Sequence, residues 1–437
     1  MIIPLIIIIA RLFSFVSRVF NIGMGGTWPG EIALRLKPDI LTVLSRRIKE
    51  GVILISGTNG KTTTSHLIRA ILAGGGKKVI INKSGANLIN GVVSALITQC
   101  NVRGQLKADY AVFEVDENSL PLVISQLDSK LKVNKKLIII LLNLFRDQLD
   151  RYGEVDVIAQ KWTKAIQLLD SKTTLILNAD DPQIAFFGIK SNARVKYFGL
   201  FDKSDYYGLK EHATDSTFCP KCGQNLFYQA IFFSHLGIWN CLKCQLTRPQ
   251  PEIISHAPIL SGKYNKYNTF AAVLAARECN INQEIIIKAL NEFTPAFGRQ
   301  EEFVIHGKKI KVFLSKNPVG YNESLKTVIG DGARILLIIL NDRIPDGRDI
   351  SWIWDVDFEM IPDQCEIFLS GERVYDLALR IKYTKKNKNP KLMVEPKLND
   401  AIKKGLELTL DNETLYILPT YSAMLEVRKI LRGRKIN

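Results

Sequence analysis

The sequence predicts an α/β protein with two domains built on parallel sheets. From Gly51 onward, apolar runs typical of buried strands alternate with segments of helical periodicity. The alternation breaks at 204–255, where four cysteines gather, and a second strand series follows a boundary marked by Pro and Gly. A chain of 437 residues is also too long for one ordinary core. We therefore expect an N-terminal helical segment at 1–45, a central domain at 46–302 that carries the insert, and a C-terminal α/β domain at 303–437.

The individual elements follow from these periodicities. The central strands are expected in "GVILIS", "DYAVFEVDE", "KKLIIILLNLF" and "TTLILN", with helices in "TTTSHLIRAILAG" and "NTFAAVLAARE". The C-terminal strands are expected in "KVFLS", "RILLIIL", "CEIFLSG" and "TLYILPT", with a last helix in "SAMLEVRKILRG". This order of strands and helices is typical of doubly wound sheets.

The first twenty residues, "MIIPLIIIIARLFSFVSRVF", predict an amphipathic helix. Their uninterrupted apolar run ends at Ala10, before Arg11, so it is too short to span a bilayer, which needs about 20 residues. No positive charge precedes it, unlike in a signal peptide. The helix either packs on the domain behind it or rests on a membrane surface. We expect a cytoplasmic chain.

The charge balance favours anionic partners without choosing among them. The chain has 59 Lys and Arg against 43 Asp and Glu, a net charge of +16. Such a surface attracts phosphates, nucleic acid or an acidic membrane face.

A phosphate-binding loop is predicted at "ISGTNGKTTT" (55–64), between a strand and a helix. Backbone N–H groups at a helix N-terminus bind phosphate, glycines allow close approach, Lys61 neutralises charge and Thr62 can ligate Mg²⁺. Isoleucine stands at position 55, where the full motif has glycine. A tight turn that happens to hold Lys61 is the alternative. The residues expected to form the site are Gly57, Thr58, Asn59, Gly60, Lys61, Thr62 and Thr63.

Two acids follow a neighbouring strand in "FEVDE". Glu114 and Asp116 lie where a carboxylate could hold Mg²⁺ between phosphates. Solvated acids at a strand end are the alternative, but the phosphate loop in the same sheet favours the metal.

The insert predicts a structural zinc site. Two C-x₂-C pairs are separated by eighteen residues, a spacing typical of two knuckles around one Zn²⁺, formed here by Cys219, Cys222, Cys241 and Cys244. Four thiolates leave no position for a reacting water, and the insert lacks an obvious core of its own, so the metal should supply folding energy. Cys100, Cys279 and Cys365 are expected to be small buried residues, and the five histidines solvated or singly bonded.

A charged loop, "NDRIPDGRDISWIWD" (341–355), follows the apolar run "RILLIIL". It is either a solvated turn pinned by two tryptophans or a functional loop at a strand end. Trp352 and Trp354 are the expected anchors.

At this point the sequence resembles the Mur ligase family. "SGTNGKTTT", "EVDE", "NLFRDQLDRYGE", "LNADDP", "GKYNKYNTFAA" and "FGRQE" follow the order of the Mur ligase central domain. The Cys₄ insert, "KNPVG" and "DGRDISWIWDVDFE" narrow the resemblance to the MurT-type subunits of lipid II isoglutaminyl synthases, over nearly the whole chain. The resemblance implies a Mur ligase-like central domain with a Cys₄ zinc-ribbon insert and a Rossmann-like C-terminal domain.

The resemblance also implies roles for particular residues. Lys61 and Thr62 would contact ATP phosphate and Mg²⁺, Glu114 would be a metal-side carboxylate, and Asn268 and Arg299 would line the nucleotide site. In ordinary Mur ligases a carbamylated lysine follows the "NLFRDQLD"-like motif; Lys161 lies near that place, with a register that the sequence does not fix.

The implied reaction is ATP-dependent amidation of the D-glutamate α-carboxyl in lipid II, through an acyl-phosphate, at the inner membrane face. The resemblance implies that ammonia comes from glutamine through a separate GatD-type glutaminase subunit, and the absence of a glutaminase cysteine motif in this sequence agrees with that division. In the family the MurT-type subunit lends that partner an aspartate, and we expect Asp349 in this role, then Asp346, with Asp355 structural.

Two other functions fit parts of the sequence. A folylpolyglutamate-type ligase shares the phosphate loop but does not need the Cys₄ insert. A zinc-ribbon ATPase that binds nucleic acid could use the +16 charge, and its affinity would fall with salt. We expect no nucleic-acid partner.

Overall fold

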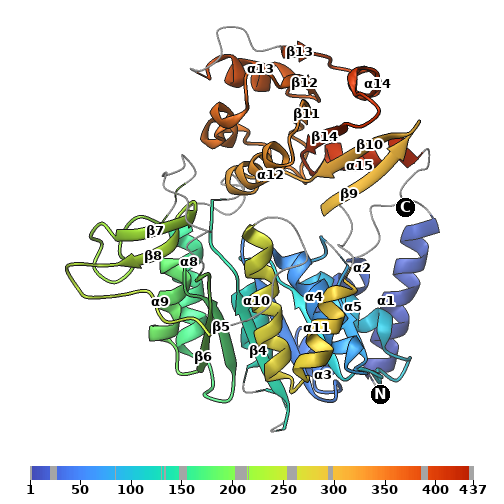
Figure 1. Cartoon of the computed structure of the whole chain (residues 1–437). Helices are drawn as coiled ribbons and strands as arrows, with labels where there is room; N and C mark the ends of the chain where they lie inside the picture. Colours follow the sequence, from blue (N-terminus) through green and yellow to red (C-terminus); the bar gives the residue numbers. More distant parts are fainter. Residues whose placement is uncertain are drawn as a thin grey trace. The chain divides into compact units, whose positions relative to one another are not determined.

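The computed structural model describes residues 2–19, 27–83, 85–128, 130–131, 134–146, 155–201, 214, 216–252, 263–293, 299–384 and 392–432, with the side chains at 2, 17–19, 299 and 300 left out. The chain forms two compact units. Nearly all described residues before 294 belong to the first unit, and those from 299 onward belong to the second (Figure 1).

The first unit is built on a six-stranded sheet in which all pairs are parallel. Its central strands are continuous apolar runs because helices cover both faces of a parallel sheet. The strand order is β2 (Val79–Ile81), β3 (Tyr110–Glu114), β1 (Gly51–Ser56), β4 (Lys136–Leu141), β5 (Thr174–Asn178) and β6 (Arg194–Phe198).

Helices of the first unit pack in two groups around this sheet (Figure 1). One group joins α4 (Lys61–Gly74), α10 (Lys263–Glu278) and α11 (Gln283–Asn291). The other runs through α3 (Ile40–Ser45), α6 (Leu120–Leu127), α8 (Val155–Gln167) and α9 (Pro182–Lys190), while α5 (Ile89–Gln99) contacts both α3 and α2 (Trp28–Leu36). The predicted doubly wound arrangement is confirmed for this unit.

The N-terminal helix α1 (Ile2–Val19) packs on the first unit. Ile6, Ile7 and Ala10 are buried, and α1 contacts α2 and α5. Arg11 points to the domain and donates from Nη2 to the carbonyl oxygens of Ile97, at 2.7 Å, and Cys100. Packing on the domain, one of the two expected arrangements, is therefore confirmed.

The insert forms an antiparallel hairpin of β7 (Phe227–Phe233) and β8 (Leu236–Asn240), flanked by the cysteine pairs. Its core is shared with α9, because Trp239 and Leu246 pack with Ala185 and Phe186 in one cluster that includes the cysteines. The hairpin and α9 are both seen in Figure 1.

The second unit carries another six-stranded sheet, ordered β13 (Leu392–Val394), β12 (Glu366–Ser370), β11 (Ile335–Ile339), β14 (Thr414–Pro419), β10 (Lys308–Phe313) and β9 (Arg299–Ile305). Only the β9–β10 pair is antiparallel. Its helices are α12 (Pro318–Gly330), α13 (Val374–Lys382), α14 (Leu398–Leu408) and α15 (Tyr421–Arg432), with short 3₁₀ turns η2 (Ser351–Asp355) and η3 (Phe358–Met360).

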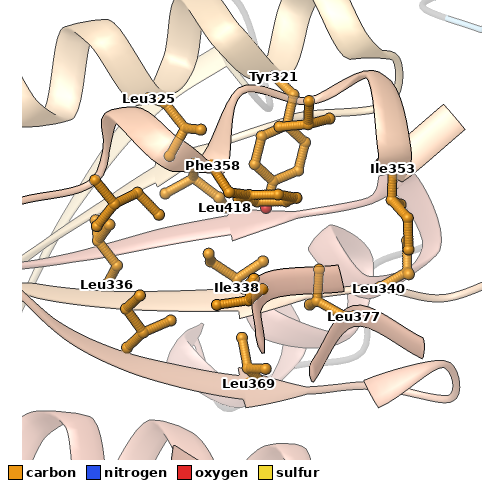
Figure 2. Close-up of a cluster of buried hydrophobic side chains, with 14 of the residues drawn as sticks. Tyr321, Leu325, Leu336, Ile338, Leu340, Ile353, Phe358, Leu369, Leu377 and Leu418 are labelled. Carbon is orange, nitrogen blue, oxygen red and sulfur yellow. The ribbon is translucent and has the colours of Figure 1, made fainter. Parts of the chain in front are cut away.

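Alternate residues of β11 enter cores on opposite faces of this sheet, as the two-residue period of a strand requires. Leu336, Ile338 and Leu340 join the cluster in Figure 2, where Tyr321 of α12 meets Phe358 edge to face at 5.4 Å. Ile335 and Ile339 join the core on the other face, formed largely by α14 and α15.

Candidate active site

The phosphate loop joins β1 to α4 and needs glycine at two positions. Gly57 and Gly60 have φ of 139° and 94°, which L side chains rarely adopt. A Cβ at Gly57 would lie 2.9 Å from the Asn143 carbonyl oxygen, and one at Gly60 would lie 2.1 Å from Asn268 Oδ1. These backbone conformations therefore fit the close approach that sequence analysis expected.

Asn143, at the end of β4, holds the loop in place. Its carbonyl oxygen accepts from the Thr58 N–H at 3.1 Å, and its Oδ1 accepts from the Asn59 N–H at 2.8 Å. The helix that follows has Gly60 as its N-cap and no side-chain cap from the residues described. A helix N-terminus without a side-chain cap is suited to an anion, because the helix dipole favours negative charge there. Sequence analysis did not identify Asn143.

Lys61 is nearly buried and its charge is balanced by a carboxylate. Its Nζ donates to the Gly57 carbonyl oxygen at 2.5 Å and to Glu117 Oε1 at 2.8 Å. Glu117 was not singled out, although it is the last acid of "FEVDE". Only the tertiary structure distinguishes it from the other two acids in that run.

Glu114 and Thr62 come together as oxygen donors. Thr62 Oγ1 donates to Glu114 Oε2 at 2.8 Å, and Ser65 Oγ donates to Glu114 Oε1 at 3.0 Å. Hydroxyl and carboxylate oxygens beside a phosphate site suit Mg²⁺, which prefers one or two carboxylates and retains water and phosphate ligands. The oxygen atoms of Thr62 and Glu114 therefore fit a magnesium ion, and their role as its ligands stays a prediction. Asp116 is buried and accepts from the Asn118 N–H at 3.1 Å, so it shapes the following turn.

Asn268 also reaches the phosphate loop. This residue of α10 is buried, and its Oδ1 accepts from Thr64 Oγ1 at 3.3 Å. The Arg299 side chain lies outside the described part of the structure, so its expected role stays a prediction. Lys161 of α8 donates from Nζ to Asn118 Oδ1 at 2.6 Å, beside the "EVDE" turn. Its carbamylation likewise stays a prediction.

A buried acid after β5 links three parts of the first unit. Asp180, fully buried after β5, accepts from Arg248 Nε at 2.6 Å, from the Tyr267 hydroxyl at 2.6 Å and from the Leu200 N–H at 2.9 Å. Burial raises the pKa of the Asp180 carboxyl to about 6, against the lowering effects of Arg248 and these hydrogen bonds. Through these hydrogen bonds, Asp180 connects α10, which carries Tyr267, and the segment after β8, which carries Arg248, to the C-terminal ends of β5 and β6.

The insert contacts the same segment of chain. Trp239 Nε1 donates to the Ala179 carbonyl oxygen at 3.1 Å, and the Gly237 N–H donates to the Asp180 carbonyl oxygen at 3.0 Å. His235 is buried, with its Nε2 3.3 Å from Asp181 Oδ2 and its ring 4.9 Å from that of Phe145. Neither ring nitrogen of His235 makes a hydrogen bond with the described residues. The expectation that every histidine is solvated or singly bonded is therefore wrong for His235, because the turn between β7 and β8 packs its ring against Phe145.

The four cysteines have the geometry of a tetrahedral metal site. All four Sγ atoms lie within 4.8 Å of one another, and the Cys219–Cys244 and Cys222–Cys241 pairs are 3.5 Å apart. Zn–S bonds of about 2.3 Å would place tetrahedral sulfur atoms roughly 3.8 Å apart. The cluster therefore fits one metal ion, and its identity as structural zinc stays a prediction. Cys100, Cys279 and Cys365 are buried outside it, as expected.

In the second unit, the structure distinguishes the aspartates of the charged loop after β11. Asp346 is buried and accepts from the N–H of Ser422, at 2.8 Å, and from its hydroxyl, so it caps the start of α15. Asp349 is half-buried and accepts from the Ser351 N–H at 2.8 Å. Its carboxylate therefore keeps acceptor capacity toward solvent.

The two tryptophans of this loop also differ in their exposure to solvent. Trp352 packs against the core of Figure 2, with its ring 6.0 Å from that of Tyr321. Trp354 is 50% exposed, and its ring is stacked 5.6 Å from the Arg380 guanidinium. Trp352 therefore anchors the loop, and Trp354 offers an exposed aromatic surface beside Arg380 and Tyr383.

Comparison with known proteins agrees with this geometry. The Mur ligase middle domain family model matches residues 55–276, and the MurT ligase C-terminal model matches 314–424. The MurT subunit of lipid II isoglutaminyl synthase from Staphylococcus aureus (strain COL) is 35% identical over 86% of both chains. Its counterpart from Streptococcus pneumoniae (strain ATCC BAA-255 / R6) is 32% identical over 95% of this chain and 94% of that protein.

The chain belongs to the MurT family of Mur ligases. The resemblance stated from the sequence is thereby confirmed, and family membership makes the chain an ATP-dependent ligase. Among solved structures, a pseudomurein peptide ligase type C from Methanothermus fervidus covers 90% of this MurT-family chain (80% of its own length) with a TM-score of 0.66 at 23% identity. MurF from Acinetobacter baumannii covers 92% (80% of its own length) with a TM-score of 0.61 at 16% identity. These likenesses confirm the fold class.

No helix in the described ranges of this MurT-family chain is long and apolar enough to cross a membrane.

Proposed function

We propose that this MurT-family chain amidates the α-carboxyl of D-glutamate in the lipid II stem peptide. The observation that carries the proposal is the phosphate loop at the N-terminus of α4. There Lys61 pairs with the buried Glu117, and Thr62 donates to the buried Glu114. This arrangement suits phosphoryl transfer from ATP, and the two MurT relatives named above act, by their names, in lipid II isoglutaminyl synthesis. The Mur ligase fold by itself would not identify the substrate.

In the proposed mechanism, ATP phosphorylates the carboxylate, and ammonia attacks the resulting acyl-phosphate to form the carboxamide and release phosphate. The helix N-terminus and Lys61 hold the transferred phosphoryl charge. Thr62 and Glu114 would hold Mg²⁺, which neutralises charge between the phosphates when bound. Asn268 and Arg299 are proposed to line the nucleotide site. With ATP bound, Lys61 would exchange its contact with Glu117 for one with phosphate.

We further propose that ammonia reaches this site from a glutaminase subunit of the GatD type. The relatives are named as subunits of a glutamine-hydrolysing enzyme, which supports a two-chain assembly. A cysteine nucleophile in such a partner needs a histidine, and a carboxylate orients that imidazole and stabilises its charged form. Asp349 has acceptor capacity to spare for this role, whereas both oxygens of Asp346 are committed to Ser422. The proposed place of action is the cytoplasmic face of the membrane that holds the lipid substrate.

The test is an Asp349→Asn variant assayed together with the partner subunit. We expect loss of glutamine-driven amidation, retention of ammonia-driven amidation, and an unchanged complex by size-exclusion chromatography. Asp363→Asn, at an exposed acid of the same unit, is the matched control and should retain both activities. Normal glutamine-driven turnover in Asp349→Asn would remove the residue from the triad, and loss of both activities would place it in the ligase site.

A further inference from the structure

The N-terminal helix α1 has an apolar face that the described residues of its own unit leave exposed. Its outward face consists of Leu5, Ile8, Leu12, Phe13, Phe15 and Val16, which are between 39% and 65% exposed. At roughly 100° per residue, these side chains cover an arc of about 160° of the helix circumference. The opposite side carries Ile6, Ile7 and Ala10, which are buried against the domain.

A helix that is apolar on all sides is normally buried on all sides. The domain covers only one side of α1. The two polar side chains among residues 3–16 do not relieve the exposed side, because Ser14 is buried and Arg11 is engaged with the carbonyl oxygens of Ile97 and Cys100. An exposed contiguous apolar patch of this kind marks a surface that binds another apolar phase or partner.

We propose that the outward face of α1 inserts into the surface of a bilayer that contains anionic lipid. The chemistry of the face favours lipid over protein. A protein interface carries about one hydrogen bond per 100–200 Å², and paired helices flank their apolar seam with charges, whereas the outward face of α1 offers no donor or acceptor side chain. An acyl-chain layer needs none.

Basic side chains lie beside the N-terminal end of this helix. A Cβ at Gly104 would be 3.2 Å from Ile3 Cγ2 and in close contact with Arg47 Nη1, so the 101–104 turn, Ile3 and Arg47 are immediate neighbours. Arg47 Nη1 donates to the Arg103 carbonyl oxygen at 2.6 Å, and the side chains of Arg103 and Lys107 are exposed. Val102, 51% exposed, adds an apolar side chain to the same turn. Basic side chains at the end of a surface-bound helix complement anionic headgroups.

The inward contacts of α1 determine how it meets the bilayer. Because Ile7, Ala10 and Arg11 fix its inner side to α2 and α5, the helix can only lie flat on the surface. Interfacial helices of this kind bury their apolar face about 5–10 Å into the headgroup boundary. The benefit of membrane binding rests on the proposed function, because the proposed lipid substrate lies in the same bilayer. The evidence for the lipid-binding surface comes from α1 itself.

The test is flotation of the full-length chain, alone and with its glutaminase partner, with vesicles of phosphatidylcholine containing or lacking phosphatidylglycerol. We expect binding that is stronger on phosphatidylglycerol. Leu12→Glu with Phe15→Glu should weaken binding roughly 100-fold or more, because two buried apolar side chains are lost. Leu168→Glu is the matched control, since Leu168 is 82% exposed in the same unit and outside the outward face. Circular dichroism checks that both variants fold, and Leu5→Gln with Ile8→Gln provides a second, uncharged test.

A charge variant tests the basic turn separately. Arg103→Gln with Lys107→Gln should lower affinity for phosphatidylglycerol vesicles by roughly fivefold per charge and leave phosphatidylcholine binding unchanged. Wild-type binding by Leu12→Glu/Phe15→Glu would overturn the proposal. The proposal would also be overturned if the wild-type chain bound neither kind of vesicle. The same holds if the wild-type chain formed a dimer without binding vesicles and Leu12→Glu/Phe15→Glu converted that dimer to a monomer.

The ligase assay separates this proposal from the proposed function. In detergent micelles of lipid II, the α1 variant should amidate like the wild-type chain, whereas on vesicles it should be slower. Vesicle binding without any amidation by the wild-type chain would refute the proposed function and leave the lipid surface standing.

Discussion

Replacing Arg248 by methionine should destabilise the first unit, with a cost that grows with pH. The side chain is 9% exposed, and its Nε is 2.6 Å from Asp180, which has no exposure. Arg248→Met keeps much of the side-chain volume. Among the described residues, it leaves the Asp180 carboxylate with the Tyr267 hydroxyl and the Leu200 N–H as donors. Removing one partner of a buried ion pair typically costs about 3–5 kcal/mol. The two pH units between the pKa of about 6 and pH 8 supply at most about 2.8 kcal/mol, so we expect a deficit of about 3 kcal/mol at pH 8.

The sign of the pH dependence follows from the pKa of Asp180, which burial raises from 3.8 to about 6. Between these values the unfolded chain has lost the proton and the folded chain has kept it, so stability from this group is lost as pH rises. Without Arg248, the folded pKa rises further, and stability keeps falling above pH 6 at about 1.4 kcal/mol per pH unit until that new pKa is reached. The deficit of the variant should therefore be small near pH 5 and full near pH 8.

Hydrogen exchange across β5 and β6 measures the local free energy of unfolding of the first unit separately from that of the second. Tyr267→Phe is the matched control; it removes one hydrogen bond to the same carboxylate and should cost about 1.5–3 kcal/mol. Asp180→Asn added to Arg248→Met should recover part of the loss, because no buried charge remains. An equal deficit at pH 5 and pH 8, or one below about 1 kcal/mol, would refute this reasoning.

Two further predictions concern the nucleotide loop and the insert. The double variant Lys61→Met/Glu117→Gln removes both charges of a buried pair, so the melting temperature should change little. Its ATP turnover should fall roughly 100-fold or more, because the phosphate loses its lysine. Turnover near wild type would show that Lys61 does not act at the phosphate site. Cys241→Ser should lose bound zinc by metal analysis and lower the melting temperature, because the metal supplies folding energy to the hairpin. Cys279→Ser, at a buried cysteine outside the cluster, should keep the zinc, and equal zinc content in both variants would contradict the assignment.

Local signals in the sequence predicted the parts of the structure that are set by neighbours along the chain. The apolar run 51–56, the glycines of the phosphate loop and the two C-x₂-C pairs each depend on residues within a few positions, and the structure places them as expected. The paired cysteine spacing predicted the cluster because each knuckle brings two thiols together by itself.

The contacts that the sequence did not reveal join residues far apart in the chain. Asp180 and Arg248 are separated by 68 positions, and Lys61 and Glu117 by 56. The hydrophobic periodicity of the sequence does not indicate which acid of "EVDE" contacts Lys61 or which buried carboxylate pairs with Arg248. His235 was likewise missed, because its burial depends on where the hairpin docks.

The central claim is tested most directly by the mass of lipid II after reaction with ATP, Mg²⁺ and a nitrogen donor. With ammonium, the isolated chain is predicted to replace the α-carboxyl of D-glutamate by a carboxamide and to consume ATP. With glutamine, it is predicted to do so only when the partner subunit is present. Fragmentation that places the amide elsewhere, or glutamine-driven amidation by the isolated chain, would contradict this account.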